Sequence, residues 1–262
     1  MGEPQQSPSQ PTAAWQAVAR RLAALTDLSD DETAFLEAAP SDLRQFAAGE
    51  TIFTEGTRQE CIFLCMAGWG AQFRMLPDGE RQVVDLILPG CLFGHFASDD
   101  GIYVSAAEAL IDLAAAILPT SFLGAMAREQ PRLTAAFALA LGEESSRLAE
   151  RVVSLGRRDA EMRLGHFFLE LRHQLAPAGE ADRTEVRLPV PQREIADFLG
   201  LTPVHVSRTM RRMQEAGIID YDGEFVEILD PANLAIECDF DAERLNAAQV
   251  PAAIRAALLA RD

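Results

Sequence analysis

One segment of the C-terminal third carries side chains whose types and spacing are well suited to recognising nucleic acid. An arginine can bind guanine through two hydrogen bonds, a serine can donate or accept, and a valine can contact the methyl group of thymine. Arginines farther along such a segment can hold phosphates. We therefore predict that the following residues bind double-stranded DNA: Thr202, Pro203, Val204, His205, Ser207, Arg208, Arg211 and Arg212.

Two short helices are expected to position these side chains. Gly200 is suited to end the first helix in the left-handed conformation, and Thr202 to cap the second, with a proline at its first position. The inner face of the second helix is then formed by Val206, Met210 and Met213. This pattern predicts a helix-turn-helix, in which the second helix enters the major groove. The alternative is a solvated helix face within an ordinary all-α domain.

The net charge of the chain at first argues against a DNA-binding function, because binding to phosphates requires positive charge. The 262 residues carry a formal net charge of −17. Residues 156–215, however, contain ten arginines and nine acidic residues, about +1, so the acidity lies in the rest of the chain. Acidic surfaces elsewhere favour solubility and oppose non-specific DNA binding.

The composition and patterning place these helices in a larger α+β protein. We expect a disordered arm at residues 1–14 and a β-rich domain at residues 15–130, where apolar runs alternate with glycine turns such as Pro77-Asp78-Gly79. A long helix follows at residues 131–158, then a DNA-binding domain at 159–235 with a hairpin tip at Asp222-Gly223, and an extension at 236–262.

The long helix expected at residues 131–158 has an apolar seam suited to a parallel dimer, although packing of this helix on its own domain is the alternative. The seam consists of Phe137, Leu141, Leu148, Val152 and Leu155.

Four segments of the chain carry motifs that occur together in one family: Ala48-Gly49-Glu50-Thr51-Ile52-Phe53, Leu88-Pro89-Gly90, Ile195-Ala196-Asp197 with Leu199-Gly200-Leu201-Thr202, and Val206-Ser207-Arg208-Thr209. Through them the chain resembles the Crp/Fnr superfamily of bacterial regulators, over roughly residues 40–235. This resemblance implies a double-stranded β-roll of the cyclic-nucleotide-binding type, a dimerisation helix and a winged helix-turn-helix. It also implies a homodimer that acts on a two-fold symmetric site together with RNA polymerase.

The resemblance also places a candidate effector pocket at Phe93, Gly94, His95 and Ser105. Family members that bind cyclic AMP carry a glutamate after the glycine and an Arg-Ser pair about ten residues later. His95 and Val104-Ser105 occupy those positions here, so the partners of the ribose and the cyclic phosphate are missing. We therefore expect no cyclic AMP and predict no cofactor, with a cyclic-nucleotide-responsive regulator as the alternative.

The cysteines raise the question of a metal, a haem or a redox sensor. Oxygen-sensing members place their cluster-binding cysteines ahead of the roll, whereas the first cysteine here is Cys61, within it. Cys61 and Cys65 are expected to share one side of a strand, and Cys91 is close in sequence to His95. Because buried cysteines usually behave as small apolar side chains, we predict no metal site.

Other function classes receive little support from the sequence. No catalytic arrangement of serine, histidine and carboxylates stands out, so we predict no enzyme. No apolar run is long enough to span a membrane and the first residues do not resemble a signal peptide, which predicts a cytoplasmic protein without a membrane partner. The rival hypothesis is a ligand-binding module that acts on a protein and uses the helix-turn-helix only for packing.

Overall fold

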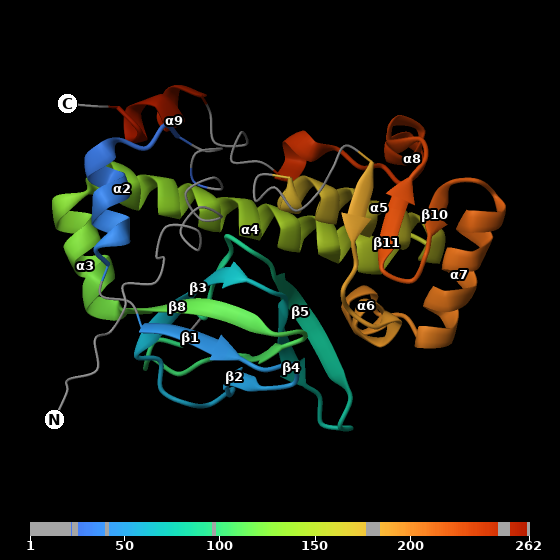
Figure 1. The fold of residues 1–262 in the computed structure, drawn as a ribbon, viewed down its shortest axis with the longest axis horizontal. Helices are drawn as coiled ribbons and strands as arrows, with labels where there is room; N and C mark the ends of the chain where they lie inside the picture. The colour runs from blue at the N-terminus through green and yellow to red at the C-terminus, as the bar shows by residue number, and fades with distance from the viewer. Residues whose placement is uncertain are drawn as a thin grey trace, which may run out of the picture.

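The computed structural model describes residues 22, 26–39, 42–95, 98–176, 184–245 and 252–260. The N-terminal strands lie along one side of a long central helix, α4, and the described elements between residues 160 and 237 gather at its far end (Figure 1). The arm expected at residues 1–14 falls outside the described residues.

Eight strands of the N-terminal half form the expected β-roll. One antiparallel sheet has the order β1-β8-β3-β6 and the other β2-β7-β4-β5. Their bounds are β1 (Asp42–Phe46), β2 (Thr51–Phe53), β3 (Cys61–Ala67), β4 (Gly70–Met75), β5 (Arg81–Ile87), β6 (Leu92–Phe93), β7 (Ala106–Ala109) and β8 (Leu113–Pro119). Aromatic rings fill the space inside the roll: Phe53 stacks on Tyr103 with centroids 4.2 Å apart, and Phe63 stacks on Phe93 at 5.1 Å.

The hairpin between β4 and β5 has its tip where the sequence predicts it. Gly79 adopts a φ of +88°, a conformation that costs glycine little. The backbone N–H of Glu80 donates to the Asp78 carboxylate at 3.1 Å, which stabilises the turn locally. This hairpin carries β5 to the edge of its sheet, next to the C-terminal elements.

Three of the described helices pack at one end of the roll. They are α2 (Asp30–Glu37), α3 (Thr120–Glu129) and α4 (Pro131–Arg157), and α4 is the long helix expected from the sequence. Pro131 occupies its first turn, where a missing N–H costs nothing. Leu133 and Phe137 of α4 pack with Leu36 and Phe122 in an apolar cluster that joins the three helices to the roll.

The C-terminal elements form the expected winged helix-turn-helix. The helices are α5 (Ala160–Leu175), α6 (Gln192–Leu199), α7 (Pro203–Glu215) and α8 (Pro231–Glu237), and the strands are β9 (Glu185–Arg187), β10 (Ile219–Tyr221) and β11 (Phe225–Ile228). The strands pair in the order β10-β11-β9, and the predicted Asp222-Gly223 tip joins β10 to β11.

The extension after α8 lies along α4. Its 3-10 helix η1 (Ala242–Leu245) contacts α4, and Arg158, just after α4, donates to the carbonyl oxygen of Asp239 at 3.1 Å. At the other end of α4, Arg132 donates to the carbonyl oxygen of Leu259, just after α9 (Ala252–Leu258), at 2.9 Å. Within the described part of the chain, no helix has the length and apolar character needed to cross a membrane.

Candidate nucleic-acid interface

Local interactions within the sequence build the two helices of the candidate interface. Gly200 ends α6 with φ +61° and ψ +39°, and its N–H donates to the carbonyl oxygen of Ala196. The Thr202 hydroxyl accepts from the N–H of His205 at 3.2 Å and so caps α7. The predicted glycine end and threonine cap are both confirmed. These contacts join residues only a few positions apart, so the turn between α6 and α7 is specified by the local sequence.

Burial divides α7 into two faces, as its sequence pattern indicates. Val206, Met210 and Met213 are almost completely buried against the domain core. All of the residues predicted to bind DNA are exposed: Thr202, Pro203, Val204, His205, Ser207, Arg208, Arg211 and Arg212. Val204 exposes 66% of its surface, which leaves its methyl groups free to contact the methyl group of a thymine.

The arginines of the outer face have few ties to the rest of the protein. Arg211 donates to Glu215 one turn later at 2.9 Å, and both side chains are largely exposed. Arg212 lies 3.8 Å from a carboxylate oxygen of Glu161 on α5. Exposed pairs of this kind contribute little free energy, so the guanidinium groups can exchange these partners for phosphates.

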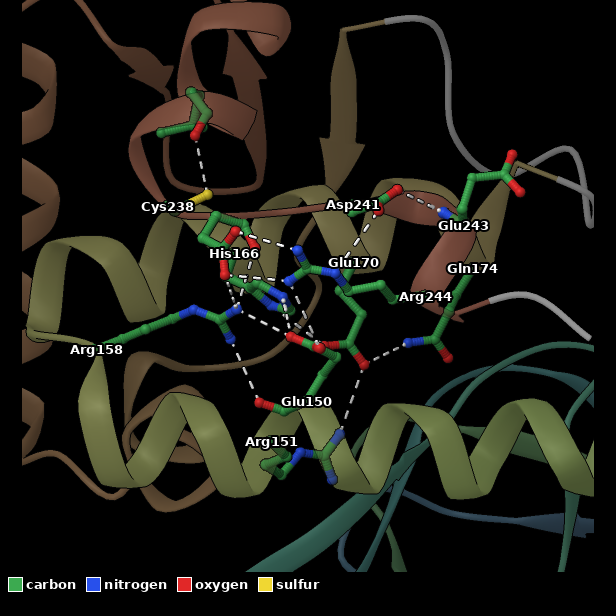
Figure 2. Close-up of polar contacts among 12 residues, drawn as sticks. Glu150, Arg151, Arg158, His166, Glu170, Gln174, Cys238, Asp241, Glu243 and Arg244 are labelled. Carbon is green, nitrogen blue, oxygen red and sulfur yellow. Dashed lines mark hydrogen bonds and ion pairs between the residues drawn. The ribbon is translucent and has the colours of Figure 1, made fainter. Parts of the chain in front are cut away.

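A buried polar cluster joins α4, α5 and the extension (Figure 2). Nε2 of His166 lies 3.5 Å from a carboxylate oxygen of Glu150, and its Nδ1 lies 3.8 Å from one of Glu170. Arg158 donates to Glu150 at 2.9 Å. Burial, with the nearby positive charge of Arg158, lowers the pKa of His166 to about 4, although Glu150 and Asp239 oppose the shift.

The same cluster continues into the roll through β5. Asp85 lies 3.2 Å from Arg151 and 3.6 Å from Arg147, and Arg151 also lies 3.7 Å from Glu170 of α5. These four side chains are all buried, so their charges depend on one another for compensation. Sequence reasoning missed this group because no spacing or motif connects residues 85, 151 and 170.

The four residues of the candidate effector pocket have different surroundings. Phe93 packs inside the roll, and Gly94, with φ +73°, sits so close to Phe63 that an added Cβ would lie 2.9 Å from its ring. His95 reaches α4, where its Nε2 lies 3.2 Å from a carboxylate oxygen of Glu144. Ser105 is buried. A small cavity between the roll and α4 is lined by other residues, among them Cys91, Glu144 and Arg147.

The three cysteines of the roll fall into two apolar clusters, although the backbone N–H of Cys65 donates to the carbonyl oxygen of Cys91 at 2.9 Å. Cys61 and Cys65 belong to the apolar cluster inside the roll, as their spacing predicts, but Cys91 packs into a different cluster. The thiol of Cys61 lies 3.9 Å from the Tyr103 hydroxyl, and burial raises its pKa. Among the described residues, no group of three or more His, Cys, Asp or Glu side chains is arranged to hold a metal ion.

The predicted apolar seam of α4 only partly faces solvent. Phe137 is buried against the N-terminal helices, Leu141 lines the cavity beside the roll, and Leu155 contacts the turn at Gly200. Val152 is 71% exposed. It belongs to a row of exposed residues with alternating spacings of four and three: Ala138, Gly142, Ser145, Ala149, Val152 and Gly156.

Comparison with known proteins agrees with this architecture. Residues 43–130 match the family model of the cyclic nucleotide-binding domain, and residues 162–236 match that of the Crp-like helix-turn-helix domain. The chain is 32% identical to the nitrogen fixation regulation protein FixK of Bradyrhizobium diazoefficiens over 72% of this chain and 78% of that protein. It is also 32% identical to FixK of Azorhizobium caulinodans, over 80% and 82%. The solved structure of FixK2 from Bradyrhizobium japonicum superposes with a TM-score of 0.67 at 26% identity, covering 75% of this chain and 96% of that one.

Proposed function

The chain belongs to the Crp/Fnr family of DNA-binding transcription regulators, and from this premise we propose that it reads a two-fold symmetric site as a homodimer. Each protomer would place the outer face of α7 in the major groove. The observation that carries the proposal is the division of α7, because every residue predicted to bind DNA is exposed while the opposite face is buried.

The residues of α7 take different roles according to their position. Arg208 is the main reader of bases, and Val204, His205 and Ser207 tune the choice of sequence, because residues near the start of a recognition helix reach base edges. A second group holds phosphates and sets the register, namely Thr202, Arg211 and Arg212. Pro203 starts the helix. The exposure of this face speaks against the alternative in which the helix-turn-helix serves only for packing.

The exposed row on α4 supports the homodimer. Small side chains at Ala138, Gly142, Ser145 and Ala149 let two helices approach closely, and Val152 adds an apolar contact. Alternating spacings of four and three keep such a row on one side of a helix along its whole length. The proposed dimer face therefore shares Val152 with the seam expected from the sequence but is centred on smaller residues.

A test of the proposal begins with genome-wide mapping of the DNA that the protein binds, which yields the site. Binding to that site is then measured by fluorescence anisotropy over a range of salt concentrations. Arg208→Ala should weaken binding by about 1–3 kcal/mol and relax the preference for the contacted base. Arg212→Ala should weaken binding to all sequences. The slope of log affinity against log salt concentration should fall by about 1, as expected for the loss of one phosphate contact.

The matched control is Arg128→Ala, which removes an exposed arginine near the end of α3. It changes the net charge by the same amount but leaves α7 intact. If Arg208→Ala binds the mapped site as tightly as Arg128→Ala does, the assignment of Arg208 is wrong. If the parent protein forms no sequence-selective complex with DNA at moderate salt, the proposal that the outer face of α7 recognises a DNA sequence is wrong.

Two further parts of the proposal follow from regulation of transcription. The DNA-bound dimer would act with RNA polymerase, and it would do so in the cytoplasm, where bacterial DNA is transcribed. Pull-down of RNA polymerase on promoter DNA with and without the protein tests the first part, and cell fractionation tests the second.

A further inference from the structure

One side chain of the roll bridges to the DNA-binding domain at the edge of its sheet, beside an apolar cluster that the two domains share. Arg81 begins β5 and lies over the ring of Phe73, 5.1 Å from its centroid. Its Nη1 lies 3.1 Å from a carboxylate oxygen of Glu108 on β7, within the roll. Its other two nitrogens cross to α6, where Nε lies 3.3 Å from Asp197 and Nη2 donates to Glu194.

Charge and burial make this contact sensitive to a single substitution. The Arg81 side chain is 15% exposed and that of Glu194 is 4% exposed, so water screens their interaction weakly. Arg193 also pairs with Glu194, but it belongs to α6 itself and cannot join α6 to the roll. Without the Arg81 guanidinium, Glu108 on the roll would face two carboxylates on α6, and the contact would turn from attraction to repulsion.

Neighbouring residues of β5 extend the contact along α6. The side-chain amide of Gln82 donates to the carbonyl oxygen of Asp197 at 2.9 Å. Arg151 of α4 donates to the carbonyl oxygen of Val84, and its guanidinium lies 3.8 Å from the centroid of the Phe198 ring. The edge of the roll, α4 and α6 therefore meet at one place, and Figure 1 shows α6 between β5 and α7.

The opposite face of α6 is packed on α7, which makes α6 the connection between the roll and the recognition helix. Ile195 and Leu199 are buried in the same cluster as Val206 and Met210. A recognition helix in this arrangement cannot change its position relative to α4 unless the contact between β5 and α6 opens.

We propose that Arg81 is a positioning residue for DNA reading, which fixes the separation of the two recognition helices by docking α6 on β5. The inference rests on the homodimer of the proposed function. The half-sites of such a dimer lie about 34 Å apart. A dimer whose recognition helices are already held at this separation loses less conformational entropy on binding than one whose domains move independently.

The test compares three variants on two DNA duplexes, the mapped two-fold site and a single half-site. Arg81→Glu reverses the charge of the contact, and Arg81→Glu combined with Asp197→Arg restores an opposite-charge pair. The control is Arg74→Glu, the same charge change in the neighbouring strand β4, where an exposed arginine pairs with Glu55 at 3.3 Å.

Arg81→Glu should bind the two-fold site at least about tenfold more weakly than Arg74→Glu, because a mostly buried ion pair is broken. Its affinity for the single half-site should equal that of the control, and the double variant should recover most of the loss. Equal affinity of Arg81→Glu and Arg74→Glu for the two-fold site would overturn the proposal. An equal loss of affinity for the single half-site would overturn it as well, because the substitution would then have damaged the recognition helix α7 itself.

Small-angle X-ray scattering without DNA gives a second, independent measurement. Arg81→Glu should have a larger radius of gyration than Arg74→Glu, and the double variant should return to the parent value. Unchanged scattering of Arg81→Glu would overturn the docking role even if DNA binding falls. If the parent binds no DNA selectively, the proposed function fails, whereas the scattering still decides whether Arg81 docks the two domains.

Discussion

Acidification should destabilise the protein through His166, the buried imidazole of the cluster in Figure 2. Burial and Arg158 lower its pKa to about 4 in the folded protein, from 6.5 in an unperturbed chain. Above pH 6.5 the side chain is neutral in both the folded and the unfolded state. Between pH 6.5 and pH 4 the unfolded chain takes up a proton that the folded protein does not, so the free energy of unfolding falls.

The size of the effect follows from the two pKa values. Their difference corresponds to about 3 kcal/mol, lost at up to about 1.4 kcal/mol per pH unit. Glu170 acts in the opposite direction, because burial raises its pKa and the folded protein then binds a proton at a higher pH than the unfolded chain does. Its contribution to stability is present at low pH and is lost as the pH rises through the folded-state pKa. Variants at each residue separate the two contributions.

The assay is urea unfolding followed by circular dichroism at a series of pH values from 7 to 4.5. His166→Asn should flatten the dependence of the unfolding free energy on pH, and Glu170→Gln should make it steeper than in the parent. His205→Asn, which replaces an exposed histidine, is the control and should follow the parent curve. The reasoning is refuted if His166→Asn loses stability between pH 6.5 and pH 4.5 as steeply as the parent.

Three other expectations concern the dimer, the roll and the effector. Ala149→Glu places a charge on the exposed row of α4 and should convert the dimer to monomers in multi-angle light scattering; a dimer of unchanged affinity would rule out this face. Gly94→Ala brings a Cβ to 2.9 Å from Phe63 at a φ of +73°, and should lower the unfolding free energy by about 1–3 kcal/mol. In the same urea unfolding assay, Gly79→Ala, at an open turn, should lower the unfolding free energy less; an equal loss would show that the structure relieves the close approach at Gly94. Calorimetry with cyclic AMP and cyclic GMP should show no micromolar binding, because His95 is directed to Glu144 and no arginine precedes Ser105; a micromolar dissociation constant would restore the nucleotide-responsive alternative.

The helix-turn-helix was within reach of the sequence because its determinants are local. Gly200, Thr202 and Pro203 act through hydrogen bonds and backbone preferences that span three or four residues. The periodicity of α7 assigns Val206 to the inside and Arg208 to the outside without knowledge of any other element. The turn glycines between short apolar runs likewise predicted a β-rich domain, and the resemblance implied that it is a β-roll; the two four-stranded sheets confirm both.

Contacts between distant segments required the tertiary structure. Arg81 meets Glu194, and Asp85 meets Arg151, across 113 and 66 residues of sequence. Periodicity could find the apolar seam of α4 but not its surroundings, since the roll and the turn at Gly200 cover Leu141 and Leu155 and leave Val152 exposed. The sequence therefore determined which residues lie on the exposed face of α7, since helix caps and periodicity are short-range. Only the folded chain decided how the recognition helix is held, because charge compensation depends on which side chains meet in space.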